Sequence, residues 1–211
     1  MAGCSSVQSN PATENQWIDL LPPAADGREV SLEPQPGQSW ACTNFGGEGE
    51  VSWRQGNLIL PMGSPLTGIH WPDGLPQTVN YQIEVTASRL SGNDFFCGLT
   101  FPVDASHATI VLGGWGGGLC GLSCVDDMDA GSNATRSYQS FAQNTPYTLR
   151  VEVRADAIRA WLDGALLLEQ ATANHKISLR TEMLPSAPLG VASFMTRAAI
   201  HQVRWRPLAG Q

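Results

Sequence analysis

The sequence contains almost no lysine: Lys176 is the only one among 211 residues. Acidic residues outnumber basic ones by 19 to 12, and the formal net charge at pH 7 is −7. Proteins that bind nucleic acid neutralise phosphates with clustered lysine and arginine side chains. The composition therefore argues against a nucleic-acid partner. The sequence also has no apolar run long enough to cross a bilayer as a helix.

Helical periodicity is also missing. Apolar residues instead recur with a period of two, which indicates strands. The clearest case is 80–89, where Tyr81, Ile83 and Val85 fall on one face and polar residues fall between them. The same pattern predicts strands at 51–54, 58–60, 94–103, 107–112, 147–154, 158–162, 165–168, 177–182, 189–194 and 199–206. Many short strands separated by turn residues are typical of an all-β fold, here a two-sheet antiparallel β-sandwich or jelly roll.

The N-terminal segment does not continue this pattern. A single domain of residues 25–211 accounts for most of the length, and residues 1–24 precede it as a flexible tether. The tripeptide Ala2-Gly3-Cys4 is typical of the end of a bacterial lipoprotein signal, in which Cys4 would carry the lipid. This predicts an exported periplasmic or cell-surface lipoprotein that contacts the membrane only through an anchor at Cys4. The alternative is an ordinary cysteine in a flexible tail.

The other four cysteines include no C-x-x-C pair, which disfavours a zinc site built from Cys97, Cys120, Cys124 and His107. An even number of cysteines in an exported protein is compatible with disulfides. Cys120 and Cys124 are predicted to lie in one strand, where four residues span about 13 Å, too far for them to pair with each other. Cys97 lies in an apolar run and is expected to behave as a small buried hydrophobic residue.

Tryptophan is common, and two of the seven tryptophans are predicted to lie in loops. His70 and Trp71 precede the turn sequence Pro72-Asp73-Gly74, so we expect Trp71 at a loop tip. Trp115 lies within five glycines, which allows a sharp turn and an accessible indole. Carbohydrate recognition needs such flat apolar surfaces beside polar groups. The alternative for Trp115 is a plug at one end of the core.

Two groups of charged residues are candidates for ligand contacts. Hard oxygen ligands are concentrated in Asp126, Asp127, Asp129 and Asn133, which predicts a calcium site, although such runs also form ordinary solvated turns. Arg180 and Glu182 are expected on one side of a strand, either as a hydroxyl-binding pair or as a surface ion pair. No carboxylate pair suited to glycosidic hydrolysis is evident, and the E-x-D-x-E strand of the jelly-roll endoglucanases is absent.

Four segments together resemble the concanavalin A-like domains of planctomycete proteins and, more distantly, the 3-keto-disaccharide hydrolase family. They are NYQIEVTASRLSGNDFFCGLTFPV (80–103), LGGWGGGLCGLSCVD (112–126), IRAWLDG (158–164) and PLGVASFMTRAAIHQVRWRPL (188–208). The resemblance implies a concanavalin A-like jelly roll, a scaffold that hosts lectins, binding modules, lyases and glycosidases. It also implies an Arg after a Glu near the end of the strand at 80–89. Arg89 matches that Arg, and Thr86 stands in place of the Glu.

Together these features predict a carbohydrate-binding module of an exported lipoprotein, with a glycan or small saccharide as its partner. One alternative is a glycoside hydrolase similar to the 3-keto-disaccharide hydrolases, and another is a structural or adhesive module that binds protein. The expected ligand contacts lie on a rim of loops and strand ends. They are His70, Trp71, Arg89, Asp94, Trp115, Asp126, Asp129, Arg180 and Glu182.

Overall fold

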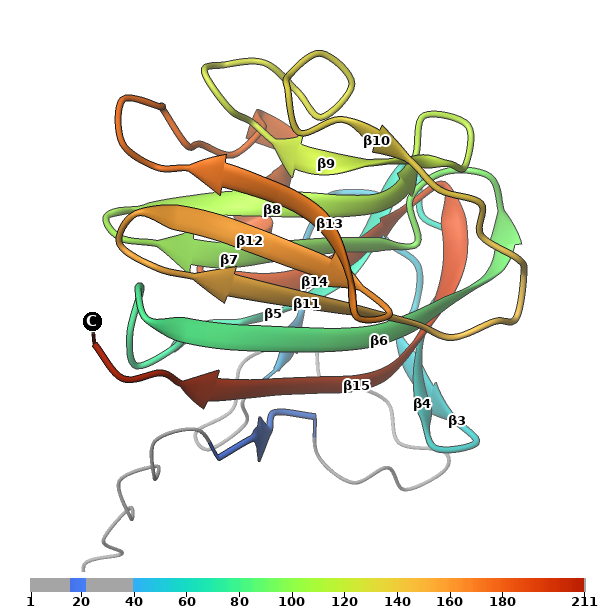
Figure 1. The fold of residues 1–211 in the computed structure, drawn as a ribbon. Helices are drawn as coiled ribbons and strands as arrows, with labels where there is room; N and C mark the ends of the chain where they lie inside the picture. The colour runs from blue at the N-terminus through green and yellow to red at the C-terminus, as the bar shows by residue number, and fades with distance from the viewer. Residues whose placement is uncertain (1–15, 22–39, 211) are drawn as a thin grey trace, which may run out of the picture.

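The computed structural model describes residues 16–21 and 40–210. The expected lipidation site, Cys4, and most of the expected tether lie outside these residues. The described chain forms two antiparallel sheets packed face to face, and Figure 1 shows them as two layers. The predicted all-β fold, a two-sheet antiparallel jelly roll of the concanavalin A-like type, is confirmed. In the described part of the chain, no helix is both long and apolar enough to span a membrane.

The eight-stranded sheet is built around its two longest strands, β6 and β15. Its strands are, in spatial order, β13 (Ala165–Ala171), β12 (Ala157–Leu162), β11 (Tyr147–Val153), β6 (Tyr81–Gly92), β15 (Thr196–Pro207), β4 (Asn57–Leu60) and β3 (Ser52–Arg54), with β1 (Ile18–Asp19) paired to β15. The alternation predicted for 80–89 is observed, since Tyr81, Ile83 and Val85 are buried in the core between the sheets.

The seven-stranded sheet forms the second layer. Its strands are, in spatial order, β10 (Ser137–Tyr138), β9 (Leu119–Ser123), β8 (Ser106–Gly114), β7 (Cys97–Val103), β14 (Leu189–Phe194), β5 (Leu66–Trp71) and β2 (Ala41–Cys42). Leu99, Ile110 and Leu122 point from this sheet into the shared core. The residues between them point to the outer face, and that face carries a second, smaller apolar cluster that includes Val111 and Met183.

Residues ahead of position 25 also belong to the folded domain. Ile18 and Asp19 pair with Trp205 and Arg204 of β15, and Leu20 is buried in the core. The Trp17 ring lies 4.6 Å from the Arg204 guanidinium carbon. This segment therefore covers the edge of the sandwich, ahead of the boundary expected from the sequence.

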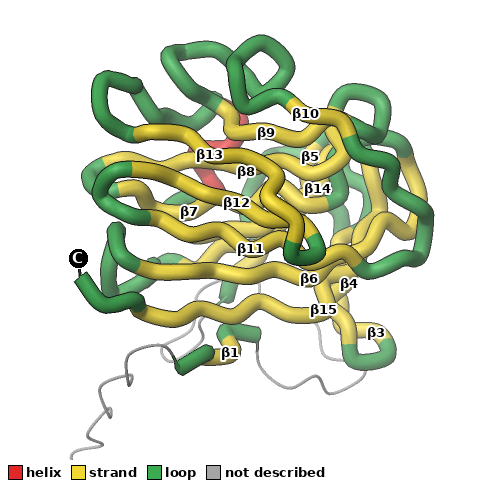
Figure 2. The backbone as a smooth tube through the Cα atoms, viewed as in Figure 1, coloured by secondary structure: helices red, strands yellow, loops and turns green. Residues whose placement is uncertain are grey.

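The strand predicted at 177–182 is wrong. Ser178 exchanges only an isolated pair of backbone hydrogen bonds with Cys124, and a short 3-10 helix, η1 (Thr181–Ser186), follows. Pro185 lacks a backbone N–H and cannot continue a strand ladder, which favours this departure from the sheet. The helix packs on the outer face of β5 and β14, and Figure 2 shows it in red behind the strands of the other sheet.

Trp71 is not at a loop tip. It is the last residue of β5 and pairs with Leu189. Its ring packs edge to face against Trp40 at 5.6 Å between ring centroids, so it is partly covered rather than presented to solvent.

The cysteines within the described residues are buried thiols at positions 42, 97, 120 and 124. The prediction that Cys97 is a small buried hydrophobic residue is confirmed, since it has no exposed surface. Burial raises the pKa of the Cys97 thiol to about 12 and that of Cys120 to about 11.

Candidate functional site

A pocket of about 280 Å³ opens on the outer face of the seven-stranded sheet. Its floor consists of side chains that alternate with core residues along four strands. They are Leu66 of β5, Thr109 and Val111 of β8, Ser123 of β9 and Phe194 of β14. Because alternate strand residues point to opposite faces, the same strands that build the core also build this floor.

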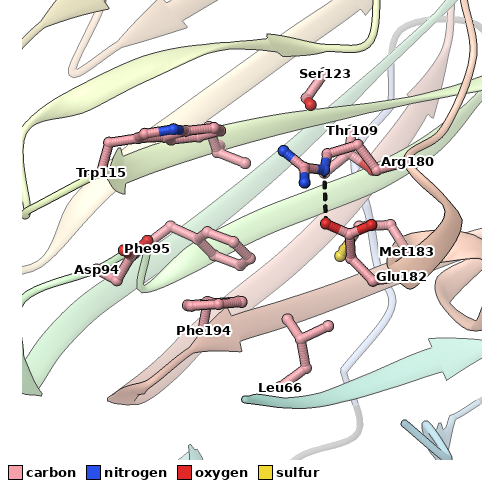
Figure 3. A pocket seen from close by; sticks show the side chains of 11 residues that line it. Leu66, Asp94, Phe95, Thr109, Trp115, Ser123, Arg180, Glu182, Met183 and Phe194 are labelled. Carbon is pink, nitrogen blue, oxygen red and sulfur yellow. Dashed lines mark hydrogen bonds and ion pairs between the residues drawn. The ribbon is translucent and has the colours of Figure 1, made fainter. Parts of the chain in front are cut away.

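Trp115 forms one wall of the pocket. It lies in the turn between β8 and β9 and adopts a φ of 47°, flanked by Gly113, Gly116 and Gly117 at positive φ. Glycine is required at Gly113, since a Cβ there would collide with the Arg89 guanidinium. Trp115 is 45% exposed, and Figure 3 shows its indole nearly edge-on with one face turned toward Phe95 and Phe194. The geometry therefore favours an accessible platform over a core plug.

Asp94 and Phe95 join the same side of the pocket from the segment between β6 and β7. The backbone of Asp94 is fixed by Thr196, whose hydroxyl accepts from the Asp94 amide at 3.0 Å and donates to the Asp94 carbonyl at 3.1 Å. Asp94 Oδ1 accepts the Phe95 amide at 2.7 Å. In the described part of the chain, Oδ2 has no hydrogen-bond partner, so it is available to a ligand.

Arg180 and Glu182 form the opposite wall, at the start of η1 (Figure 3). Arg180 Nε donates to Glu182 Oε1 at 2.6 Å, and Nη1 lies 3.2 Å from Asp129 Oδ2. Asp129 is in turn fixed by the Gly131 amide, which donates to its Oδ1 at 3.1 Å. The guanidinium is therefore held in place by two carboxylates, one inside the pocket and one behind it.

Thr109 and Ser123 place hydroxyl groups on the pocket floor. Thr100 of β7 and Thr109 of β8 are hydrogen-bonded at 2.8 Å between their Oγ1 atoms, and Ser123 is directly opposite Thr109 in the next strand. The pocket thus has an aromatic face on one side, carboxylates and a guanidinium around the rim, and hydroxyls below. These groups can contact a ligand that has both C–H faces and hydroxyl groups.

The structure brings together four of the ligand residues predicted from the sequence: Asp94, Trp115, Arg180 and Glu182. It also places Asp129 directly behind Arg180. Sequence reasoning missed the floor and its aromatic side chains. The alternation along 107–112 was a usable signal for Thr109 and Val111, but nothing local indicated that this face would be covered by η1.

His70 and Trp71 lie outside the residues that line the pocket. Thr43 Oγ1 is 3.2 Å from His70 Nδ1, and burial lowers the pKa of His70. Trp71 packs against Trp40, as described above. Neither side chain supports the predicted contact at this pocket.

Arg89 is a supporting residue rather than a rim residue. It is only 6% exposed, and its Nη2 donates to the carbonyls of Asp94, Gly113 and Gly117 at 2.9–3.1 Å. Its guanidinium carbon lies 5.2 Å from the centroid of the Phe96 ring. Arg89 therefore joins the two segments that carry Asp94 and Trp115 without reaching the ligand space. Arg89 continues the alternation of Tyr81, Ile83 and Val85 along β6, so its side chain lies on the core side instead of the rim on which it was expected.

The four candidate calcium ligands are not brought together. Asp126 accepts from His175 and from the Lys176 amide, and Asp127 pairs with the Lys176 ammonium at 2.7 Å. Asn133 is buried, and its amide group donates to backbone carbonyls while its Oδ1 accepts from Thr135. No group of three or more His, Cys, Asp or Glu side chains within the described residues is arranged to hold a metal ion.

A second polar cluster lies on the outer face of the eight-stranded sheet. His201 Nε2 is 3.0 Å from Ser88 Oγ, and its Nδ1 is 2.6 Å from Asn57 Oδ1. The order of these contacts matches that of a nucleophile, a base and an orienting group. Ser88 is only 2% exposed, however, so its hydroxyl is shielded from a substrate carbonyl.

No protein-family model matches the chain, and no curated protein matches it. Solved structures match its fold. A carbohydrate-binding module, CBM66 from Bacillus subtilis, is 15% identical, with 80% of this chain and 95% of that chain covered and a TM-score of 0.56. A protein of unknown function with a galectin-like fold from Bacillus subtilis is 10% identical, with 93% and 100% covered and a TM-score of 0.56.

A third solved structure is an enzyme. SCLam, a non-specific endo-β-1,3(4)-glucanase from family GH16, is 8% identical, with 98% of this chain and 94% of that chain covered and a TM-score of 0.55. Similarity at these identities shows a shared fold, and binding modules and enzymes both occur on it.

Proposed function

We propose that this protein is a carbohydrate-binding module and that the pocket under Trp115 is its binding site. The observation that carries the proposal is the half-exposed indole of Trp115, whose face borders a pocket rimmed by Asp94, Arg180 and Glu182. The indole offers a surface for the C–H face of a sugar ring, and the rim offers acceptors and donors for its hydroxyls. The fold similarity to a carbohydrate-binding module supports the same conclusion.

The pocket also has the rigidity that recognition requires. Trp115 is held by the backbone turn that Arg89 fixes, and Arg180 is held by Glu182 and Asp129. A ligand therefore meets side chains whose positions are already set, so binding costs little ordering entropy.

A glycan array followed by calorimetric titration of the hits tests the proposal. Wild-type protein is expected to bind at least one glycan, and Trp115→Ala is expected to weaken that binding by at least about tenfold, roughly 1.4 kcal/mol. Trp161→Ala is the matched control, because Trp161 is a partly exposed tryptophan that stacks under Arg150 on the other sheet. If binding survives Trp115→Ala and is lost in Trp161→Ala, the binding site lies on the other sheet and the proposal is wrong.

A second candidate function is glycoside hydrolysis, similar to that of the 3-keto-disaccharide hydrolases. The observation that favours it is the presence of two carboxylates, Asp94 and Glu182, on opposite walls of one pocket (Figure 3). Glycosidases use two such groups as acid and as nucleophile or base. The protein is an enzyme if the wild type releases sugar from a glycoside and if Asp94→Asn and Glu182→Gln each abolish that release. Binding without release would identify a module.

We also propose that the protein is exported as a lipoprotein, on the support of the sequence Ala2-Gly3-Cys4. A metabolic lipid label should then be incorporated when the protein is expressed in a bacterium with its native upstream sequence, and Cys4→Ser should abolish the label. Equal labelling of both forms would show that Cys4 is not the anchor.

A further inference from the structure

The charges around the pocket restrict which sugars it accepts. Two carboxylates and one guanidinium line it: Asp94, Glu182 and Arg180. Asp129, just behind Arg180, is a third carboxylate within contact distance of that guanidinium. Acidic groups therefore outnumber basic ones at the site, as they do in the whole chain, whose formal net charge is −7.

Two of the three guanidinium nitrogens of Arg180, the only cationic lining residue, already contact carboxylates. Its Nε lies 2.6 Å from Glu182 Oε1, and its Nη1 lies 3.2 Å from Asp129 Oδ2. An anionic ligand that approached Arg180 would therefore also approach two carboxylates. Because like charges repel most where water is partly excluded, the two flanking carboxylates disfavour the binding of an anion at this guanidinium.

Two further rim atoms are acceptors without partners. In the described part of the chain, Asp94 uses only Oδ1 and Glu182 uses only Oε1, which leaves Asp94 Oδ2 and Glu182 Oε2 without a donor. A carboxylate oxygen accepts hydrogen bonds and donates none. Its natural ligand groups are sugar hydroxyls and ammonium groups, and a second carboxylate is disfavoured.

We infer that the pocket selects sugar residues without negative charge and rejects uronic and sialic acids. The inference rests on the proposed sugar-binding function of this pocket and adds its substrate class. It makes Asp94 and Glu182 specificity residues: they accept hydroxyl groups from the correct ligand and repel the carboxylate of an acidic one.

The experiment uses pairs of oligosaccharides that differ only at C6, one with a hydroxymethyl group and one with a carboxylate, such as galactosides against galacturonides. The uncharged member of a bound pair is expected to bind at least about tenfold more tightly at low salt. Added salt should narrow the ratio, because it screens the repulsion between partly exposed charges.

Two variants test the assigned residues. Glu182→Gln removes one negative charge and weakens the contact to Arg180 Nε, because a neutral amide oxygen replaces the carboxylate, so the ratio within a pair should fall to about threefold or less. Asp94→Asn removes a charge without changing the contacts of Arg180 and should reduce the ratio by a smaller factor. The matched control is Glu169→Gln, because Glu169 is an exposed carboxylate on the other sheet that pairs with Arg159 at 2.9 Å. It should leave the ratio unchanged.

The outcomes separate this inference from the function on which it rests. Two results would overturn the inference and leave sugar binding intact. One is that acidic members bind as tightly as their uncharged partners. The other is that the affinity ratio does not respond to salt or to Glu182→Gln. Failure of every glycan of either kind to bind would overturn the proposed function and the inference with it. Thermal midpoints of the variants, measured in parallel, exclude unfolding as the cause of any change.

Discussion

Arg89 donates a hydrogen bond from Nη2 to the Gly113 carbonyl oxygen at 3.0 Å, and this contact connects the core side of β6 to the turn that carries Trp115. The same Nη2 also contacts the Gly117 carbonyl on the far side of Trp115 and the Asp94 carbonyl. One buried guanidinium thus sets the spacing of two pocket walls, and a glycine at 113 is the only residue that leaves room for it.

Arg89→Met should loosen the pocket. It keeps most of the apolar stem but leaves the carbonyls of Asp94, Gly113 and Gly117 without their charged donor, at a cost of about 2–4 kcal/mol. Amide exchange should rise at 93–96 and 113–118 and stay unchanged in β11, and glycan affinity should fall. Arg89→Lys should restore part of the exchange protection and part of the glycan affinity.

The control for this variant is Arg150→Met, which removes a partly buried arginine that stacks on Trp161 at 4.8 Å, away from the pocket. It should lower stability without accelerating exchange at 113–118. A uniform rise of exchange over the whole sandwich in Arg89→Met would show a general structural role instead of a positioning one.

Trp115→Ala should cost little stability, because the residue is 45% exposed and lines a pocket on the outer face instead of the core. We expect less than about 1.5 kcal/mol from denaturant unfolding, whereas Trp205→Ala should cost about 3–5 kcal/mol. Trp205 is the appropriate comparison because it is only 4% exposed and belongs to the main core. Equal losses in the two variants would make Trp115 a packing residue.

Stability should fall as pH decreases from about 7.5 to about 5. Burial lowers the pKa of His70, His107 and His201 in the folded state. Below the ordinary histidine pKa of about 6.5, the unfolded chain binds protons that the folded chain does not, which favours unfolding. Denaturant midpoints across this range measure the slope, and His201→Gln should flatten it. A wild-type midpoint that is constant or rises toward pH 5 would contradict the assignment.

The core thiols should resist alkylation in the native state. Cys97 is fully buried, and its pKa of about 12 keeps it protonated at neutral pH, so it lacks the reactive thiolate. Iodoacetamide at about pH 8 should leave Cys97 and Cys120 unmodified until denaturant is added, as peptide mass spectrometry will show. Rapid native-state labelling of Cys97 would mean that the sandwich opens locally near β7.

The sequence alone predicted only part of the arrangement of the candidate site residues. The glycines around Trp115 predicted an exposed turn because their effect on the backbone is local. Arg180 and Glu182 were expected to meet as neighbours on one strand. They do meet, but at the start of η1, where the chain has left the sheet and crosses the outer face of β5 and β14.

What the sequence determined by itself was most of the longer strands and the face that each of their side chains presents, although β5 was not predicted and the strand predicted at 177–182 was wrong. Period-two alternation is a property of a few consecutive residues, so β6 and β8 were predictable without knowledge of their neighbours. The tertiary structure decided the order of strands in each sheet, and therefore which outward-facing residues share a floor. Thr109, Phe194 and Leu66 come together only because β8, β14 and β5 lie in one sheet, and long-range pairing of this kind depends on the packing of the whole core.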